Sequence, residues 1–166
     1  MTAITLEQIQ AKQTELTSMI AQLLATPKQA PTTIEIEEDS IDLASGEHYA
    51  GVVLNANGQH MHHLVLMAAQ PSKDLAWSAA LEWAGRAGGA LPTRQEQALL
   101  FANCKPHLQP RWYWSCEEHE SETSYAWHCN FNDGYQTSYH KSYEGSAVAV
   151  RRACAFNPLI LSELSR

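Results

Sequence analysis

The sequence predicts an α+β fold in which short antiparallel strands pack with a few helices. Near the N-terminus, apolar residues recur at helical spacing. Residues 111–152 instead consist of short aromatic or β-branched runs separated by turn residues, which is typical of antiparallel strands. Two more segments with helical patterning lie between these regions. The expected order is helix, linker, two or three strands, two helices and four strands.

Residues 5–25 are predicted to form a helix. Thr5 and Gln8 fit a capping box at its start. Residues then recur at alternating spacings of three and four, as in the a/d seam of a coiled coil; they are Leu6, Ile9, Gln13, Leu16, Ile20 and Leu23. So short a helix is marginal alone. It packs either on its own domain or, as its narrow stripe favours, in a homo-oligomer, with a trimer preferred to a dimer.

A linker separates this helix from the rest of the chain. Pro27 and Pro31 stop the helix and stiffen the segment, and residues 33–37 alternate like a strand. The acidic residues here form a solvated edge rather than a cation site; they are Glu35, Glu37, Glu38 and Asp39. The predicted division is an oligomerisation helix at 1–26, a linker with a first strand at 27–45, and a main domain at 46–166.

Two strands are expected at 47–54 and 59–67, because Asn55-Ala-Asn57-Gly58 between them is a hairpin signal. His60 and His62 in the second strand share a face, as two metal ligands would. No third ligand can be identified, so we interpret them as ordinary surface or half-buried histidines. The sequence therefore predicts no metal site and no cofactor.

Two helices follow these strands. The first is expected over about 74–87, where Gly88-Gly89 provides the residue that ends it. Thr93 and Glu96 form a capping box for the second. The two glycines are not a phosphate loop, because no Gly-Lys-Ser/Thr follows them.

The turn Asn132-Asp133-Gly134 admits two registers for the strands beside it. A two-residue turn places Phe131 opposite Gln136, whereas a three-residue loop with Gly134 left-handed places Phe131 opposite Tyr135. We prefer the second, because it separates aromatic from polar side chains. The inward set is Trp112, Trp114, Cys116, Trp127, Cys129, Phe131, Tyr135, Thr137 and Tyr139. The outward polar set, our candidate ligand-binding residues, is Tyr113, Glu117, His128, Asn130, Gln136, Ser138 and His140.

Composition restricts the classes of function. A formal net charge of -7 opposes sequence-independent nucleic-acid binding and adhesion to anionic membranes. The N-terminus lacks the features of a signal peptide, and no apolar run approaches the roughly 20 residues of a spanning helix. We therefore expect synthesis in the cytoplasm and no membrane insertion. The cysteines, expected to be free thiols rather than disulfides, are Cys104, Cys116, Cys129 and Cys154.

Four motifs occur in a specific order across roughly residues 46–156: Gly89–Glu96, Trp112–Ser115, Ala126–Gly134 and Val150–Arg152. Together they resemble the C-terminal domain family of the collagen-like adhesin of Legionella (Lcl). The resemblance implies a C-type-lectin-like fold, with two helices beside small twisted antiparallel sheets and strands from both ends of the domain paired. Members occur in bacterial surface proteins, phages and prophages, and this chain is most similar to the phage-encoded branch.

The chain departs from calcium-dependent lectins at the motifs that would bind the ion. The nearest strings are Gln109-Pro110-Arg111, where arginine places a cation instead of a ligand oxygen, and Asn132-Asp133, which lies in a hairpin turn. We therefore expect no lectin-type calcium site. The adhesin binds sulfated polysaccharide, which the charge of -7 disfavours here.

The outward polar set has the composition of an adaptable binding surface, although an ordinary solvated sheet face alternates in the same way. With the resemblance, it predicts a non-enzymatic phage tail or tail-fibre protein in the virion, contacting other virion proteins and a cell-surface glycan or protein receptor. One alternative is a structural virion or assembly protein without receptor contact. Another is an enzyme similar to formylglycine-generating enzymes, using Cys116 and Cys129 as a pair.

Overall fold

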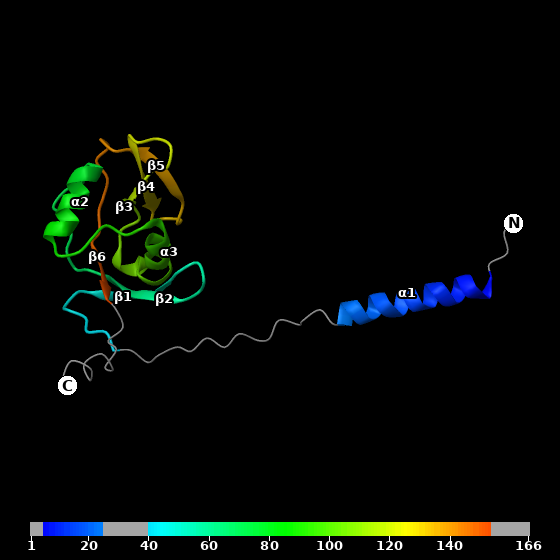
Figure 1. Ribbon diagram of the computed structural model, residues 1–166. Helices are drawn as coiled ribbons and strands as arrows, with labels where there is room; N and C mark the ends of the chain where they lie inside the picture. Colours follow the sequence, from blue (N-terminus) through cyan, green and yellow to red (C-terminus); the bar gives the residue numbers. More distant parts are fainter. Residues whose placement is uncertain (1–4, 25–39, 154–166) are drawn as a thin grey trace, which may run out of the picture. The chain divides into compact units, whose positions relative to one another are not determined.

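The computed structural model describes residues 5–24 and 40–153 (Figure 1). The chain divides into two compact units, 1–38 and 39–166. The described residues form an N-terminal helix in the first unit, and further helices with two three-stranded antiparallel sheets in the second. These elements confirm the predicted α+β class. The expected strand at 33–37, the acidic residues up to Asp39 and Cys154 lie outside the described residues.

Helix α1 comprises Leu6–Leu24. At its start the backbone N–H of Thr5 donates to Oε1 of Gln8 at 3.2 Å, which is one half of the predicted capping box. The apolar seam is solvent-exposed in the single chain: Leu6 is 71% exposed, Leu16 61% and Ile20 50%. The side chain of Leu23 is outside the description. A short helix with an exposed apolar stripe gains little stability from its own contacts.

The first sheet contains β1 (His48–Leu54), β2 (His60–Leu66) and β6 (Val150–Ala153), in the order β1-β2-β6. In the β1–β2 turn, Oδ1 of Asn55 accepts the N–H groups of Asn57 and Gln59, and Gly58 has a φ of 75°. The glycine therefore takes the left-handed conformation that the turn requires, which confirms the predicted hairpin. Strand β6 enters from the other end of the unit and pairs with β2.

Helix α2 comprises Trp77–Arg86 and ends as predicted. The N–H of Gly89 donates to the carbonyl of Ala84 and that of Gly88 to Gly85, both at 3.0 Å, with Gly88 at a φ of 85°. This is a Schellman motif. The helix starts at Trp77 rather than residue 74, because the backbone of Leu75 instead pairs with Gly145 through two hydrogen bonds, of 2.9 and 3.0 Å.

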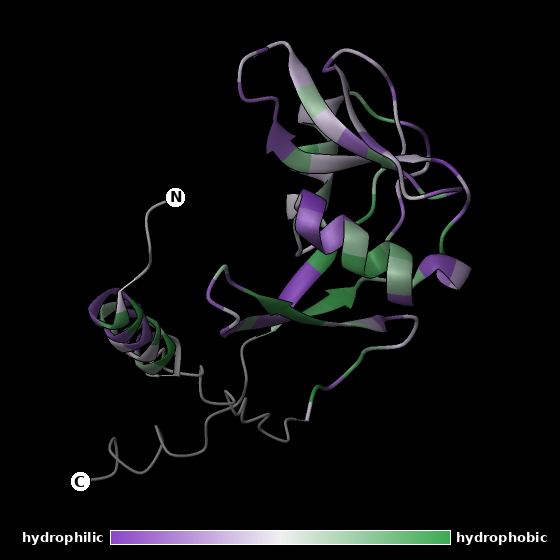
Figure 2. Cartoon of the chain, turned by 90° about the vertical axis from the view of Figure 1, so that its right-hand side faces the viewer, coloured by the Kyte–Doolittle hydropathy of each residue, from purple (hydrophilic) through white to green (hydrophobic). Residues whose placement is uncertain are grey.

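Helix α3 comprises Arg94–Asn103 and has the complete capping box predicted for it. Oγ1 of Thr93 accepts the N–H of Glu96 at 3.1 Å, and Oε2 of Glu96 accepts the N–H of Thr93 at 2.8 Å. A short 3₁₀ helix, η1 (Lys105–His107), follows. Helix α3 lies between the two sheets and contacts β1 on one side and β3 and β4 on the other (Figures 1 and 2).

The second sheet contains β3 (Trp112–Glu118), β4 (Tyr125–Asn130) and β5 (Gln136–His140), in the order β3-β4-β5. The other edge of β3 is paired with Ser146, whose carbonyl accepts the N–H of Trp114 at 3.0 Å. From Ser146 the chain continues into β6 of the first sheet. The segment 145–153 therefore joins the two sheets.

The apolar core is divided into two clusters. The first surrounds α3 and includes Leu64, Leu100, Tyr113 and Phe131. The second packs α2 against β3 through Ala80, Leu91 and Trp114. Figure 2 shows the strongest hydrophobic colour in the first sheet, on one side of α3. Because the neighbours Tyr113 and Trp114 are 6% and 1% exposed and belong to different clusters, the middle of β3 is covered on both faces.

A buried carboxylate connects α3 to the first sheet. Glu96 is 1% exposed; it accepts hydrogen bonds from Arg152 at 2.6 and 2.8 Å, and its Oε1 lies 2.8 Å from Nε2 of His62. Burial raises the pKa of Glu96, but hydrogen bonds from Arg152, Thr93 and His62 outweigh it and hold this pKa below its usual range. His62 therefore makes a structural contact with Glu96.

Within 5–24 and 40–153, no group of three or more His, Cys, Asp or Glu side chains is arranged to hold a metal ion. None of the helices in these ranges is long and apolar enough to span a bilayer. Cys104, Cys116 and Cys129 are free thiols.

Candidate functional site

The predicted register of the β4–β5 hairpin is wrong by one residue. The N–H of Asn130 donates to the carbonyl of Tyr135 at 2.9 Å, and Trp127 lies opposite Ser138. The loop is therefore four residues long, Phe131 to Gly134, rather than three. Because side chains alternate between the faces of a strand, this shift moves every β5 side chain to the opposite face relative to β4.

Local hydrogen bonds and burial of one ring favour the longer loop. Oδ1 of Asn130 accepts the N–H of Asn132 at 2.9 Å, and Oδ1 of Asp133 accepts that of Tyr135 at 3.0 Å. Phe131 leaves the strand and is 1% exposed. Its ring packs edge-on against Tyr113 at 5.1 Å and against Phe101 of α3 at 5.9 Å.

Three of the seven candidate residues contact α3 and are buried or half-buried, so the prediction that they project outward from the sheet is wrong; they are Tyr113, Glu117 and Gln136. Tyr113 is buried in the core cluster around α3. Oε2 of Glu117 accepts the backbone N–H of Arg94, the first residue of α3, and Nε2 of Gln136 donates to the Arg94 carbonyl at 2.7 Å. These polar groups hold the start of α3 against the sheet.

The other four candidates do not form one face either. His128 and Asn130 project from the opposite side of the sheet to Tyr113 and Cys129, as the β3–β4 register requires. Ser138 and His140 lie opposite Trp127 and Tyr125 and so share the α3 side. The predicted polar face is therefore divided between both sides of the sheet.

The side of the sheet opposite Tyr113 presents a row of aromatic rings, which we call the aromatic face. Along the row, the rings are Tyr135, Trp112, His128, Tyr139 and Tyr143. The centroids of successive rings in this order lie 6.3, 4.2, 5.6 and 4.6 Å apart. The three tyrosines are 62%, 48% and 43% exposed, in chain order. This amphipathic surface is the candidate functional site.

His128 is the buried member of this row. It is 5% exposed, between the rings of Trp112 and Trp114, and its Nε2 has no hydrogen-bond partner in the described part of the chain. Burial lowers the pKa of His128 from 6.5 to about 4. The imidazole is therefore neutral at physiological pH and contributes a ring rather than a charge.

The sequence interpretation missed the tyrosines of this face because it placed Tyr135 and Tyr139 inward. Within residues 5–24 and 40–153, the Tyr135, Tyr139 and Tyr143 hydroxyls have no hydrogen-bond partner. Each phenol can therefore donate and accept hydrogen bonds to a ligand while its ring supplies contact area. The sequence signal for the four-residue loop, and so for the exposed tyrosines, was the presence of Asn130 and Asp133, since both residue types favour turns stabilised by their side chains.

The two thiols considered as a catalytic pair occupy separate places. Cys129 belongs to the core cluster around α3, whereas Cys116 packs against the cluster around α2. Burial raises the pKa of both thiols, that of Cys129 to about 11. Both are therefore protonated at neutral pH and are weak nucleophiles.

Comparison with known proteins adds no functional information. No protein-family model and no curated protein matches this chain. Its function is therefore inferred from its own residues and their geometry.

Proposed function

We propose that the chain is a non-enzymatic binding module that recognises its ligand through the aromatic face. The observation that carries this proposal is the row of contacting aromatic rings on one side of the sheet, three of which are exposed tyrosines. Tyrosine and tryptophan supply large contact areas with few rotatable bonds, and they are enriched at binding hot spots. Burial of His128 within the row and of Trp114 against it gives the exposed tyrosines a packed support.

We further propose that residues 46–156 have a C-type-lectin-like fold and that the protein is a component of a phage tail or tail fibre. The motif order of the sequence supports this assignment, as does a second unit in which strands from both ends pair. Helix α1 would assemble copies through its exposed seam and bring several aromatic faces to one receptor. The receptor would be a glycan or a protein on a bacterial surface.

The experiment measures attachment of the labelled full-length chain to a panel of bacterial cells and to a glycan array. A Tyr135→Ala/Tyr139→Ala variant should weaken attachment by at least about tenfold, because it removes the two most exposed rings of the row. Tyr125→Ala is the matched control: this tyrosine is 37% exposed on the same sheet, but lies opposite His140 on the other side.

Two outcomes would contradict the proposal. Equal attachment by the double variant and the wild type would exclude the aromatic face. Absence of wild-type attachment to every cell and glycan would instead favour a structural virion or assembly role without receptor contact. Neighbouring genes provide an independent check, since tail-fibre or baseplate genes are expected beside this one.

A further inference from the structure

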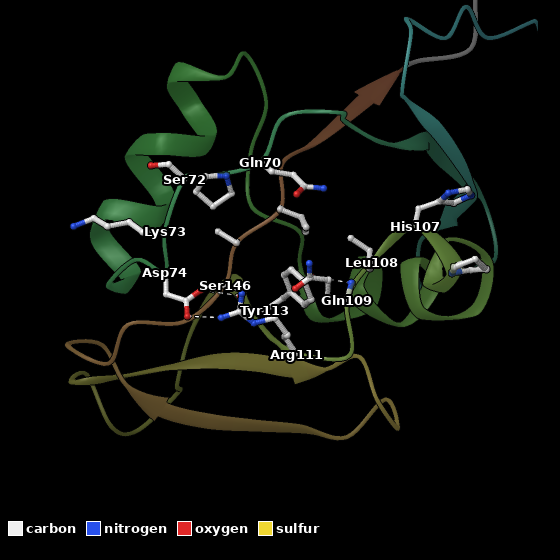
Figure 3. Close-up of a pocket in the computed structure, with 14 residues that line it drawn as sticks. Gln70, Ser72, Lys73, Asp74, His107, Leu108, Gln109, Arg111, Tyr113 and Ser146 are labelled. Carbon is white, nitrogen blue, oxygen red and sulfur yellow. Dashed lines mark hydrogen bonds and ion pairs between the residues drawn. The ribbon is translucent and has the colours of Figure 1, made fainter.

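A pocket of about 590 Å³ lies beside the edge of β3 that pairs with Ser146 (Figure 3). Three segments that are distant in the sequence line it: 70–74 before α2, 106–111 before β3, and 146–148 before β6. Tyr113 lies at the pocket, whereas its neighbour Trp112 belongs to the aromatic face. The pocket is therefore a separate site, which we call the Arg111 pocket.

The Arg111 side chain is held in place across this pocket. One terminal nitrogen of its guanidinium donates to Oδ2 of Asp74, while Oδ1 of Asp74 accepts the Ser146 hydroxyl at 2.9 Å (Figure 3). The other N–H groups of the guanidinium have no side-chain or backbone partner in the described ranges. A guanidinium oriented by Asp74 and with open N–H groups is suited to bidentate contact with an oxyanion.

The Tyr113 hydroxyl provides a second, buried donor. Tyr113 is 6% exposed, and its oxygen accepts the backbone N–H of Gln109 at 3.2 Å. No acceptor for its own O–H occurs among residues 40–153. Burial raises the pKa of Tyr113, so the phenol stays protonated and keeps this donor. Buried polar groups normally find partners, so an unpaired donor at a cavity indicates a ligand acceptor.

The charges of the pocket restrict the ligand. Lys73 and Arg111 carry two positive charges and Asp74 one negative charge, which leaves one positive charge in excess on a chain of net charge -7. One carboxylate balances this excess, whereas a phosphate monoester carries more negative charge than the pocket offsets. The side-chain amides of Gln70 and Gln109 each offer a donor and an acceptor, as ligand hydroxyl groups require.

From these features we propose that the Arg111 pocket binds a sugar acid. Its carboxylate contacts Arg111 and the Tyr113 hydroxyl, and its hydroxyl groups contact the flanking amides. This site is independent of the aromatic face, so either proposal can fail without the other.

The test is a titration of the full-length chain with D-glucuronate, followed by calorimetry. We expect millimolar affinity or better, and affinities at least about tenfold weaker for D-glucose and for acetate, each of which lacks part of the chemistry. Tyr113→Phe keeps the ring that packs on Phe131 but removes the hydroxyl, and should weaken binding about 5- to 10-fold. Arg111→Gln should weaken it more, since it removes a charged partner.

Matched controls lie outside the pocket. Tyr135→Phe removes an exposed hydroxyl and Arg86→Gln an exposed guanidinium, and both should bind D-glucuronate like the wild type. Absence of binding at about 50 mM ligand, equal affinity for D-glucose, or wild-type affinity of Tyr113→Phe would each overturn the proposal. If Arg111→Gln unfolds because Asp74 loses its partner, Tyr113→Phe decides the result.

Discussion

At the scale of single residues, His128 connects the aromatic face to the stability of the fold. Its ring is buried between Trp112 and Trp114, and Nε2 lacks a partner within the described residues. Protonation would place a positive charge in this apolar environment. Burial therefore holds the pKa of His128 at about 4 in the folded chain, against 6.5 for an exposed histidine.

The stability of the chain should depend on this histidine. The unfolded chain binds the proton more readily, so the stabilisation is complete above pH 6.5 and is lost as pH falls towards 4. We expect a loss on the order of 3 kcal/mol in the free energy of unfolding. Urea denaturation across this pH range should show that the free energy of unfolding falls less steeply with decreasing pH in His128→Gln than in the wild type. His140→Gln, an exposed control, should keep the wild-type slope; equal slopes for all three chains would contradict the prediction.

Two tryptophans of the second sheet should differ in their effect on stability, although both were expected to face inward. Trp114 is 1% exposed, and its indole N–H donates to the Leu75 carbonyl at 2.9 Å. Trp114→Ala should therefore cost about 3–5 kcal/mol through a cavity. Trp127 is half-buried, and the guanidinium carbon of Arg94 lies 3.5 Å from the centroid of the Trp127 ring. Trp127→Ala should cost about 1–2 kcal/mol. Denaturation midpoints in the reverse order would refute this.

At the scale of elements, two hairpin glycines form a natural comparison. Gly58 has a φ of 75° and open space where an alanine methyl group would lie, whereas Gly134 has a φ of 82° and a Cβ there would lie 3.1 Å from the Phe101 ring. Both replacements by alanine carry a conformational cost of about 1 kcal/mol. Gly134→Ala should add about 1–2 kcal/mol from overpacking. Thermal unfolding of both variants measures the difference, and equal losses would show that Phe101 does not constrain the loop.

At the scale of the whole molecule, the exposed seam of α1 predicts self-association. The full chain should sediment as a trimer at micromolar concentration, and a shortened chain that starts at Thr32 as a monomer. In the full chain, Leu16→Asp should dissociate the assembly, because it places a charge in the seam. Ser18→Asp, away from the seam, is the matched control. A monomeric full chain would contradict the prediction, and a dimer would correct only its number.

Signals that act between near neighbours were sufficient for most elements. The capping box of Thr93 and Glu96, the left-handed Gly88 after α2 and the turn at Gly58 all occur where the sequence predicts them. Each works through hydrogen bonds or backbone geometry within a few residues, so no distant contact is needed to recognise it. The sequence by itself therefore determined the α+β class and most helix and strand positions.

Only the tertiary structure decided which face of each strand is buried. Alternation separates two sets of side chains but does not say which set meets the core. That choice depends on α3, which covers Tyr113, and on Phe131, which packs against the distant Phe101 and lengthens the hairpin loop. The resulting one-residue shift exposes Tyr135 and Tyr139 rather than a polar row. The Arg111 pocket also depends on segments that only the folded chain brings together. Helices α2 and α3 separate its first two lining segments in the sequence, and strands β3, β4 and β5 separate the last two.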